Sequence, residues 1–161
     1  MCGIGGFVDY ERDARRFTPV AQRMKRTLTP RGPDAEGEYS DLDALLVHRR
    51  LIVIDPDGGK QPMRSPDGNT ILIYNGELYN TEEIRRDLVL RGHRFAGHSD
   101  TEVLLHAFLE WGTDAFPRLN GIFAFAIWQQ AVRRVILCRD RLGVKPLFFA
   151  RTGGGVVFGS T

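Results

Sequence analysis

Cysteine is scarce in this sequence. Only Cys2 and Cys138 occur in 161 residues, too few for the disulfide framework that holds small secreted domains together. The chain also has just four histidines, and they form no recognisable zinc pattern with the cysteines: His48, His93, His98 and His106. The two cysteines therefore need separate explanations.

Long apolar runs and a strong charge bias are missing as well. No run approaches the roughly 18 to 20 residues of a membrane span, and the N-terminus lacks the basic-then-apolar layout of a signal peptide. The net charge is +2, and the basic residues are spread along the chain. This argues against a nucleic-acid or membrane partner, and we expect a cytoplasmic protein.

The composition is that of a soluble globular chain, with 42% apolar and 26% charged residues. Its length suits one domain, which can bury roughly 70% of its unfolded surface and so needs neither a metal nor disulfides to fold. The sequence predicts three helices, at 18–28, 80–91 and 100–111. Asn80 with Glu83, and Ser99 with Glu102, have the spacing of capping boxes at the last two.

Strands outnumber helices. The apolar and β-branched segments predict strands at 2–9, 44–48, 51–54, 70–74, 123–128, 135–138, 147–150 and 156–158. The last four read as two hairpins, and Asn75-Gly76 is typical of a turn. The pattern favours a layered α+β fold, with helices packed on antiparallel sheets.

Cys2 is the first residue with chemical interest. A residue this small at position 2 allows an aminopeptidase to remove Met1, which would expose a free α-amine on Cys2. An α-amine has an ordinary pKa far below that of lysine, so it can act as a base near neutral pH. One residue would then supply both nucleophile and base. A cysteine at this position is often incidental, so Cys2 alone decides little.

Eight segments change that balance, because together they resemble the glutaminase domain of the asparagine synthetase family, within the class II glutamine amidotransferases. They occur in the family's order along nearly the whole chain: CGIGGF (2–7), RGPD (31–34), HRRLIVID (48–55), QP (61–62), YNGELYN (74–80), SDTE (99–102), LNGIFAFA (119–126) and RDRLGVKPL (139–147). Any one of them could occur by chance, whereas all eight in order form a specific signal.

The resemblance implies catalytic roles for three residues. Cys2 would be the nucleophile, and the Asn75 side chain with the Gly76 backbone N–H would form the oxyanion hole. Five further positions would bind the substrate. Arg50 would hold the substrate's α-carboxylate, and Glu77 and Asp100 would hold its α-ammonium. Leu51 and Val53 would line the pocket with their backbone. Charges at both ends would select a free amino acid over a peptide.

Taken singly, these residues have plainer interpretations. Asp100 could be a helix-start residue, Arg50 a surface strand residue and Asn75 part of a turn; only the joint match favours function. Cys138 reads as a small buried hydrophobe, and His93 as a loop residue without a role. The 31–34 and 139–145 segments read as structural or as parts of a domain interface that shape the pocket mouth.

The resemblance further implies an N-terminal nucleophile (Ntn) hydrolase sandwich, two antiparallel sheets flanked by helices (αββα). Residues 1–161 would be the glutaminase domain, truncated near its C-terminal end, because Gly159 and Thr161 stand where relatives read alanine and glutamate. The expected activity is hydrolysis of glutamine, with no cofactor for this step. ATP and Mg would serve a C-terminal synthetase domain that is absent from this chain, and a homodimer is left open.

Three alternatives remain. Another Ntn hydrolase, such as an acylase, would act on larger amides, but reading both ends of a free amino acid argues against it. A non-catalytic domain could keep the fold as an interaction module. An amidotransferase of the same class could deliver ammonia to a different acceptor.

Overall fold

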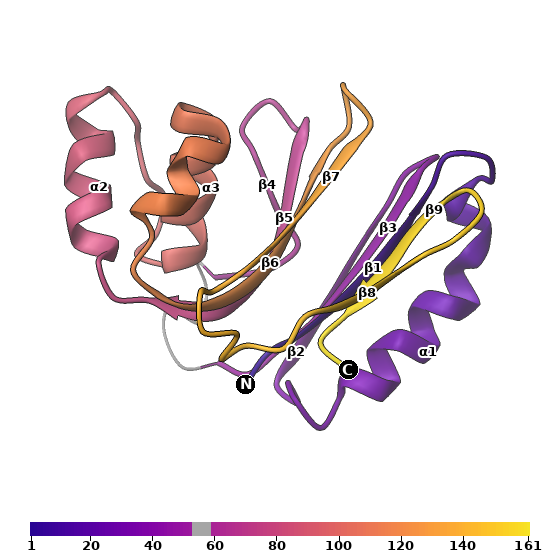
Figure 1. The fold of residues 1–161 in the computed structure, drawn as a ribbon. Helices are drawn as coiled ribbons and strands as arrows, with labels where there is room; N and C mark the ends of the chain where they lie inside the picture. Colours follow the sequence, from indigo (N-terminus) through magenta and orange to yellow (C-terminus); the bar gives the residue numbers. More distant parts are fainter. Residues whose placement is uncertain (53–58) are drawn as a thin grey trace.

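The computed structural model of the protein describes residues 1–52 and 59–161 (Figure 1). Its helices are η1 (Ala14–Phe17), α1 (Thr18–Leu28), α2 (Thr81–Leu90), α3 (Asp100–Trp111) and η2 (Gly112–Arg118). Its strands are β1 (Gly3–Asp9), β2 (Ala35–Ser40), β3 (Ala44–Arg50), β4 (Met63–Arg64), β5 (Thr70–Leu78), β6 (Gly121–Gln129), β7 (Arg134–Arg139), β8 (Phe148–Arg151) and β9 (Gly155–Gly159).

The described strands form two antiparallel sheets that pack face to face. One has the order β2-β3-β1-β9-β8 and the other β4-β5-β6-β7. Helix α1 covers the outer face of the first sheet, while α2 and α3 cover the outer face of the second (Figure 1). This is the α+β arrangement with flanking helices that the sequence led us to expect.

Alternating side chains divide the core into layers, because successive residues of a strand point to opposite faces of a sheet. Between the sheets lie Ile4 and Val8 of β1, Leu46 of β3, and Ile71 and Ile73 of β5. The intervening residues of each strand face the helices. The described residues thus give one apolar layer between the sheets and one beneath the helices on either side.

The helix at 100–111 begins as its sequence predicts. The Ser99 hydroxyl accepts a hydrogen bond from the backbone N–H of Glu102, at 3.3 Å. The Glu102 carboxylate does not complete the box on Ser99; it accepts from the backbone N–H groups of Ala96 and Gly97 instead. The carboxylate therefore fixes the loop that leads into α3.

Two local predictions were wrong, and a third was wrong where the structure describes it. Asn75 and Gly76 lie within β5, paired with Ala124 and Phe123 of β6, and form no turn. The Asn80 side chain makes no cap at α2, because it bonds across to the backbone of Arg118 and Asn120. Residues 51 and 52 follow β3 without strand structure, and the rest of the strand predicted at 51–54 lies outside the described residues.

Candidate active site

Three inward-facing rows of the inter-sheet layer end in polar residues. Cys2 precedes Ile4 by two positions, Asn75 follows Ile73 by two, and Arg50 continues the inward row of β3. The β1–β3 register pairs Gly3 with Arg49, so its next step sets Cys2 opposite Arg50. Simple strand alternation therefore delivers residues from positions 2, 50 and 75 to one end of the sandwich.

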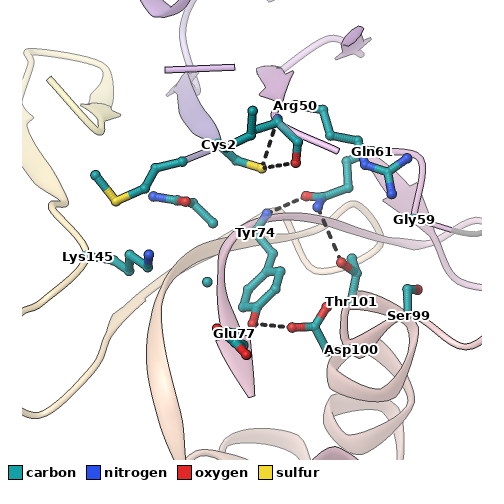
Figure 2. A pocket seen from close by; sticks show the side chains of 14 residues that line it. Cys2, Arg50, Gly59, Gln61, Tyr74, Glu77, Ser99, Asp100, Thr101 and Lys145 are labelled. Carbon is teal, nitrogen blue, oxygen red and sulfur yellow. Dashed lines mark hydrogen bonds between the residues drawn. The ribbon is translucent and has the colours of Figure 1, made fainter. Parts of the chain in front are cut away.

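A pocket opens at this end (Figure 2). Seven of the eight residues predicted from the sequence line it: Cys2, Arg50, Leu51, Asn75, Gly76, Glu77 and Asp100. The eighth, Val53, lies outside the described residues. Further lining residues are Met1, Gly59, Gln61, Tyr74, Ser99, Thr101 and Lys145.

The Cys2 thiol lies against the backbone where β3 ends. The N–H of Leu51 donates to Sγ at 3.4 Å, and the thiol lies 3.7 Å from the Leu51 carbonyl oxygen, which it reaches as a donor. The Arg31 side chain contacts the backbone of the same residue, and its Nε donates to the Cys2 carbonyl oxygen at 3.3 Å. An N–H beside the sulfur stabilises negative charge on it, which suits a nucleophile.

Among the residues that the structure describes, β4 pairs with Ile71 and Leu72 alone, so the edge of β5 beyond them is left for the pocket. Beyond them, the backbone N–H of Tyr74 donates to Gln61 Oε1 at 2.6 Å, and that of Leu78 to Asp100 Oδ2 at 3.3 Å. Backbone N–H groups two residues apart point to the same side of a strand. The N–H of Gly76 therefore points to this edge, between the two.

Gly76 also has no room for a side chain. A Cβ there would come within 2.5 Å of the Ile122 carbonyl oxygen on the neighbouring strand β6. Glycine thus keeps β5 and β6 in close register while its own N–H faces the pocket.

The Asn75 side chain supplies a second donor. The residue is 2% exposed, and its amide Nδ2 has no hydrogen-bond partner among the residues that the structure describes. A buried donor without a partner is costly and uncommon in folded proteins. An oxygen atom bound in the pocket would satisfy it.

Charged groups of both signs surround these donors. Arg50 is 7% exposed, and Asp100 lies at the start of α3, where Tyr74 Oη donates to its Oδ2 at 2.7 Å (Figure 2). Burial raises the pKa of the Asp100 carboxyl above its ordinary value, and the hydrogen bond from Tyr74 opposes that rise. The pocket can thus hold a ligand with a carboxylate at one end and an ammonium at the other.

Comparison with known proteins agrees with this geometry. Residues 1–161 match the family model of the glutamine amidotransferase domain. The chain belongs to the glutamine amidotransferase domain family. It is 48% identical, over 99% of its length, to asparagine synthetase [glutamine-hydrolyzing] 3 of Bacillus subtilis, and 34% identical, over 98%, to asparagine synthetase B of Escherichia coli. It covers 26% and 28% of these relatives, so it spans about a quarter of their length.

A solved structure shares the fold of this amidotransferase domain. Glutamine phosphoribosylpyrophosphate amidotransferase of Bacillus subtilis superimposes with a TM-score of 0.77 at 21% identity, over 99% of this chain and 42% of that one. At that identity the likeness speaks for the fold alone. The expected Ntn hydrolase sandwich is confirmed.

Sequence reasoning about this amidotransferase domain missed several pocket residues. Tyr74 and Gln61 had no predicted role in the pocket, and Lys145 was expected only as part of the 139–145 segment at the pocket mouth. Gln61 bridges two elements, since its Nε2 donates to Thr101 Oγ1 at 3.3 Å while its Oε1 holds Tyr74. The signal for Tyr74 was its place directly before Asn75, but a strand aromatic is typical of core.

Two histidines, His93 and His106, lie outside the pocket and contact each other. His93 bonds to His106 and to Glu110 near the far end of α3. Within 1–52 and 59–161, no three His, Cys, Asp or Glu side chains gather as metal ligands would. No helix in the same residues is long and apolar enough to cross a membrane.

Proposed function

We propose that this domain hydrolyses glutamine to glutamate and ammonia, with Cys2 as the nucleophile. The observation that carries the proposal is that the Cys2 thiol, the Gly76 edge N–H and the buried Asn75 Nδ2 meet in one pocket. Among the described residues, Nδ2 has no hydrogen-bond partner. Arg50 on the opposite strand and Asp100 on α3 supply the two charges that a free amino acid needs.

The reaction follows from these positions. Met1 is removed, and the α-amine of Cys2, directly or through a water, takes the thiol proton. The thiolate attacks the side-chain carboxamide carbon of glutamine, and the oxygen becomes negative as the C–S bond forms. Asn75 and Gly76 donate to that oxygen, and each such donor is typically worth about 10² to 10³ in rate.

Ammonia then leaves. The protonated amine donates its proton to the departing nitrogen as the C–N bond breaks, and a γ-glutamyl thioester remains on Cys2. Water, deprotonated by the same amine, attacks the thioester to give glutamate and the free thiol. Besides glutamine and water, these steps use only groups of this chain.

Binding of the substrate divides between β3, which carries Arg50, and the β5–α3 side of the pocket, which carries Glu77 and Asp100. Arg50 takes the α-carboxylate, because a guanidinium can make two parallel bonds to it. Asp100 and Glu77 take the α-ammonium, and Leu51 lines the pocket. An acylase of the same fold would accept N-acetylglutamine, whereas this site should reject it, because acetylation removes the ammonium charge.

We further propose that the ammonia serves an ATP- and Mg-dependent synthetase domain in a cytoplasmic protein, with aspartate as acceptor. Support comes from the curated relatives, which are asparagine synthetases about four times as long as this chain. In that setting residues 1–161 act as the glutaminase half. A different acceptor is the second candidate, because the glutaminase chemistry is independent of where ammonia goes.

The test is an intact mass of the purified protein before and after an electrophilic glutamine analogue. We expect loss of Met1 and one adduct on Cys2, and a fall in glutaminase activity of about 10⁴-fold or more in Cys2→Ala. Full activity in Cys2→Ala would refute the nucleophile. Loss of Met1 with no adduct on a folded protein would favour the non-catalytic alternative.

A further inference from the structure

Tyr74 connects the β5 segment that carries the proposed oxyanion donors, Asn75 and Gly76, with Asp100 on α3, the proposed ammonium-binding residue. Its backbone lies in β5 directly before Asn75 and Gly76, and its ring packs in the apolar layer under α2 and α3. Its hydroxyl crosses to α3 and donates to Asp100 Oδ2 at 2.7 Å (Figure 2). The side chain is 2% exposed, so water does not readily replace this bond.

One oxygen of the Asp100 carboxylate, Oδ2, accepts hydrogen bonds from two groups of β5. Leu78 N–H also donates to Oδ2, at 3.3 Å, so two donors from β5 fix the rotation of the group. Burial disfavours the ionised carboxylate and raises the pKa of Asp100, while the Tyr74 hydroxyl favours the charged form. An ammonium is bound well only by a carboxylate that is both ionised and correctly turned.

We propose that Tyr74 is a specificity-determining positioning residue, whose hydroxyl holds Asp100 in the orientation that receives the α-ammonium of glutamine. The proposal rests on the proposed glutaminase activity and adds a residue to its substrate selection. Tyr74 itself touches the carboxylate and acts on the substrate through it.

Tyr39 offers a matched control. It is also buried, at 5% exposed, and its hydroxyl donates to the Oδ2 of Asp41 at the same 2.7 Å. Asp41 lies just beyond β2 and is held by Trp128 as well, at the opposite end of the inter-sheet layer from the pocket. Tyr39→Phe and Tyr74→Phe thus remove equivalent bonds, only one of which reaches the substrate site.

Other charged or ionisable groups line the same pocket as Asp100. They come from four places: Cys2 before β1, Arg50 at the end of β3, Glu77 in β5, and Lys145 between β7 and β8. Because both single variants keep all four, a difference between their profiles reports on the hydroxyl.

The experiment measures kcat and KM for glutamine between pH 5 and 9 in the wild-type protein, Tyr74→Phe and Tyr39→Phe. In Tyr74→Phe we expect KM to rise about tenfold, since a hydrogen bond to a charged group is lost, with kcat changed less than about twofold. The KM for glutamine should also rise more steeply toward pH 5 in Tyr74→Phe, because the carboxylate loses a bond that favoured its charged form. Tyr39→Phe should match the wild-type protein in all three.

A double substitution tests whether the hydroxyl acts through Asp100. In an Asp100→Asn background, Tyr74→Phe should change KM less than about twofold, because no carboxylate remains to be positioned. Equal KM effects in both backgrounds, or equal effects of Tyr74→Phe and Tyr39→Phe, would overturn the proposal and leave the glutaminase activity standing. A wild-type protein that hydrolyses no glutamine would instead overturn the activity itself.

Discussion

The two ends of the inter-sheet layer differ in chemistry although the same strands run through both. At one end Val8, Ala44, Ile71 and Trp128 fill the space with apolar side chains. At the other end the same inward rows reach Cys2, Arg50 and Asn75, and the space stays open as a pocket. The scaffold therefore positions its reactive groups by extending core rows by one or two further residues, with no dedicated loop for these three.

This difference separates what stabilises the fold from what performs the reaction. Apolar residues in a row contribute through buried area, and removing one leaves a cavity. The polar residues at the open end contribute little packing, and Asn75 even buries a donor that lacks a partner among the described residues. Variants within one row should therefore affect stability at one end and catalysis at the other.

The largest effects are expected from Asn75→Ala and Ile71→Ala, which lie in the same row of β5. Asn75→Ala should lower kcat by about 10² to 10³ through loss of an oxyanion donor, and change the free energy of unfolding by less than about 1 kcal/mol. Ile71→Ala should lower that free energy by about 2 to 5 kcal/mol and leave kcat nearly unchanged at 25 °C.

Urea unfolding and steady-state kinetics on both variants give the two measurements. The contrast between the two ends fails if Asn75→Ala destabilises the protein as much as Ile71→Ala does. It also fails if Ile71→Ala, while folded, loses activity on the scale of Asn75→Ala.

An intermediate effect, on the pH dependence of stability, is expected at His48. This residue lies in the inward row of β3 between the apolar end and the pocket end. Its ring lies 3.2 Å from the Tyr74 carbonyl oxygen of the other sheet and is 1% exposed. Burial lowers the pKa of His48 to about 4. The unfolded chain takes up a proton near its ordinary pKa, so the folded state should lose up to roughly 3 kcal/mol of stability as the pH falls from about 6.5 to 4.

His48→Gln removes this titration and keeps a side-chain donor for the Tyr74 carbonyl. The free energy of unfolding should then fall less between pH 7 and pH 4 than it does in the wild-type protein, since the carboxylates contribute equally to both. Parallel curves for the two proteins would show that His48 does not carry the pH dependence.

Local signals located the three α-helices, but not the short helices η1 and η2 or parts of the sheets. Ser99 caps α3 as predicted because a cap depends on neighbouring residues. Asn75-Gly76 was assigned to a turn because the dipeptide is typical of one, and pairing with β6 overrides that preference. Strand β2 was missed because it lies at a sheet edge and alternates Glu36 and Glu38 with small or aromatic residues, which gives a weak apolar pattern.

The sequence predicted which residues belong to the site, but not how they are arranged in space. Residues 2, 50 and 75 have no local signal that brings them together, and only the resemblance joined them. Tyr74 escaped notice because its ring is ordinary core and its hydroxyl gains meaning only from Asp100, 26 residues later, at the start of α3. Strand register and helix placement supply that contact, and neither can be read from one segment.

The smallest effect is expected at Cys138, which makes the sharpest contrast with Cys2. Cys138 lies in β7 beside the apolar layer under α2 and α3, and burial raises the pKa of its thiol to about 11. Its thiolate is therefore scarce at pH 7.5, and a thiolate is what alkylating reagents attack. Brief treatment with iodoacetamide should label Cys2 alone, and Cys138→Ser should leave kcat, KM and this labelling unchanged. Labelling of both cysteines at equal rates would mean that burial does not separate them, and the assignment of reactivity to the pocket end would have to rest on the glutamine analogue alone.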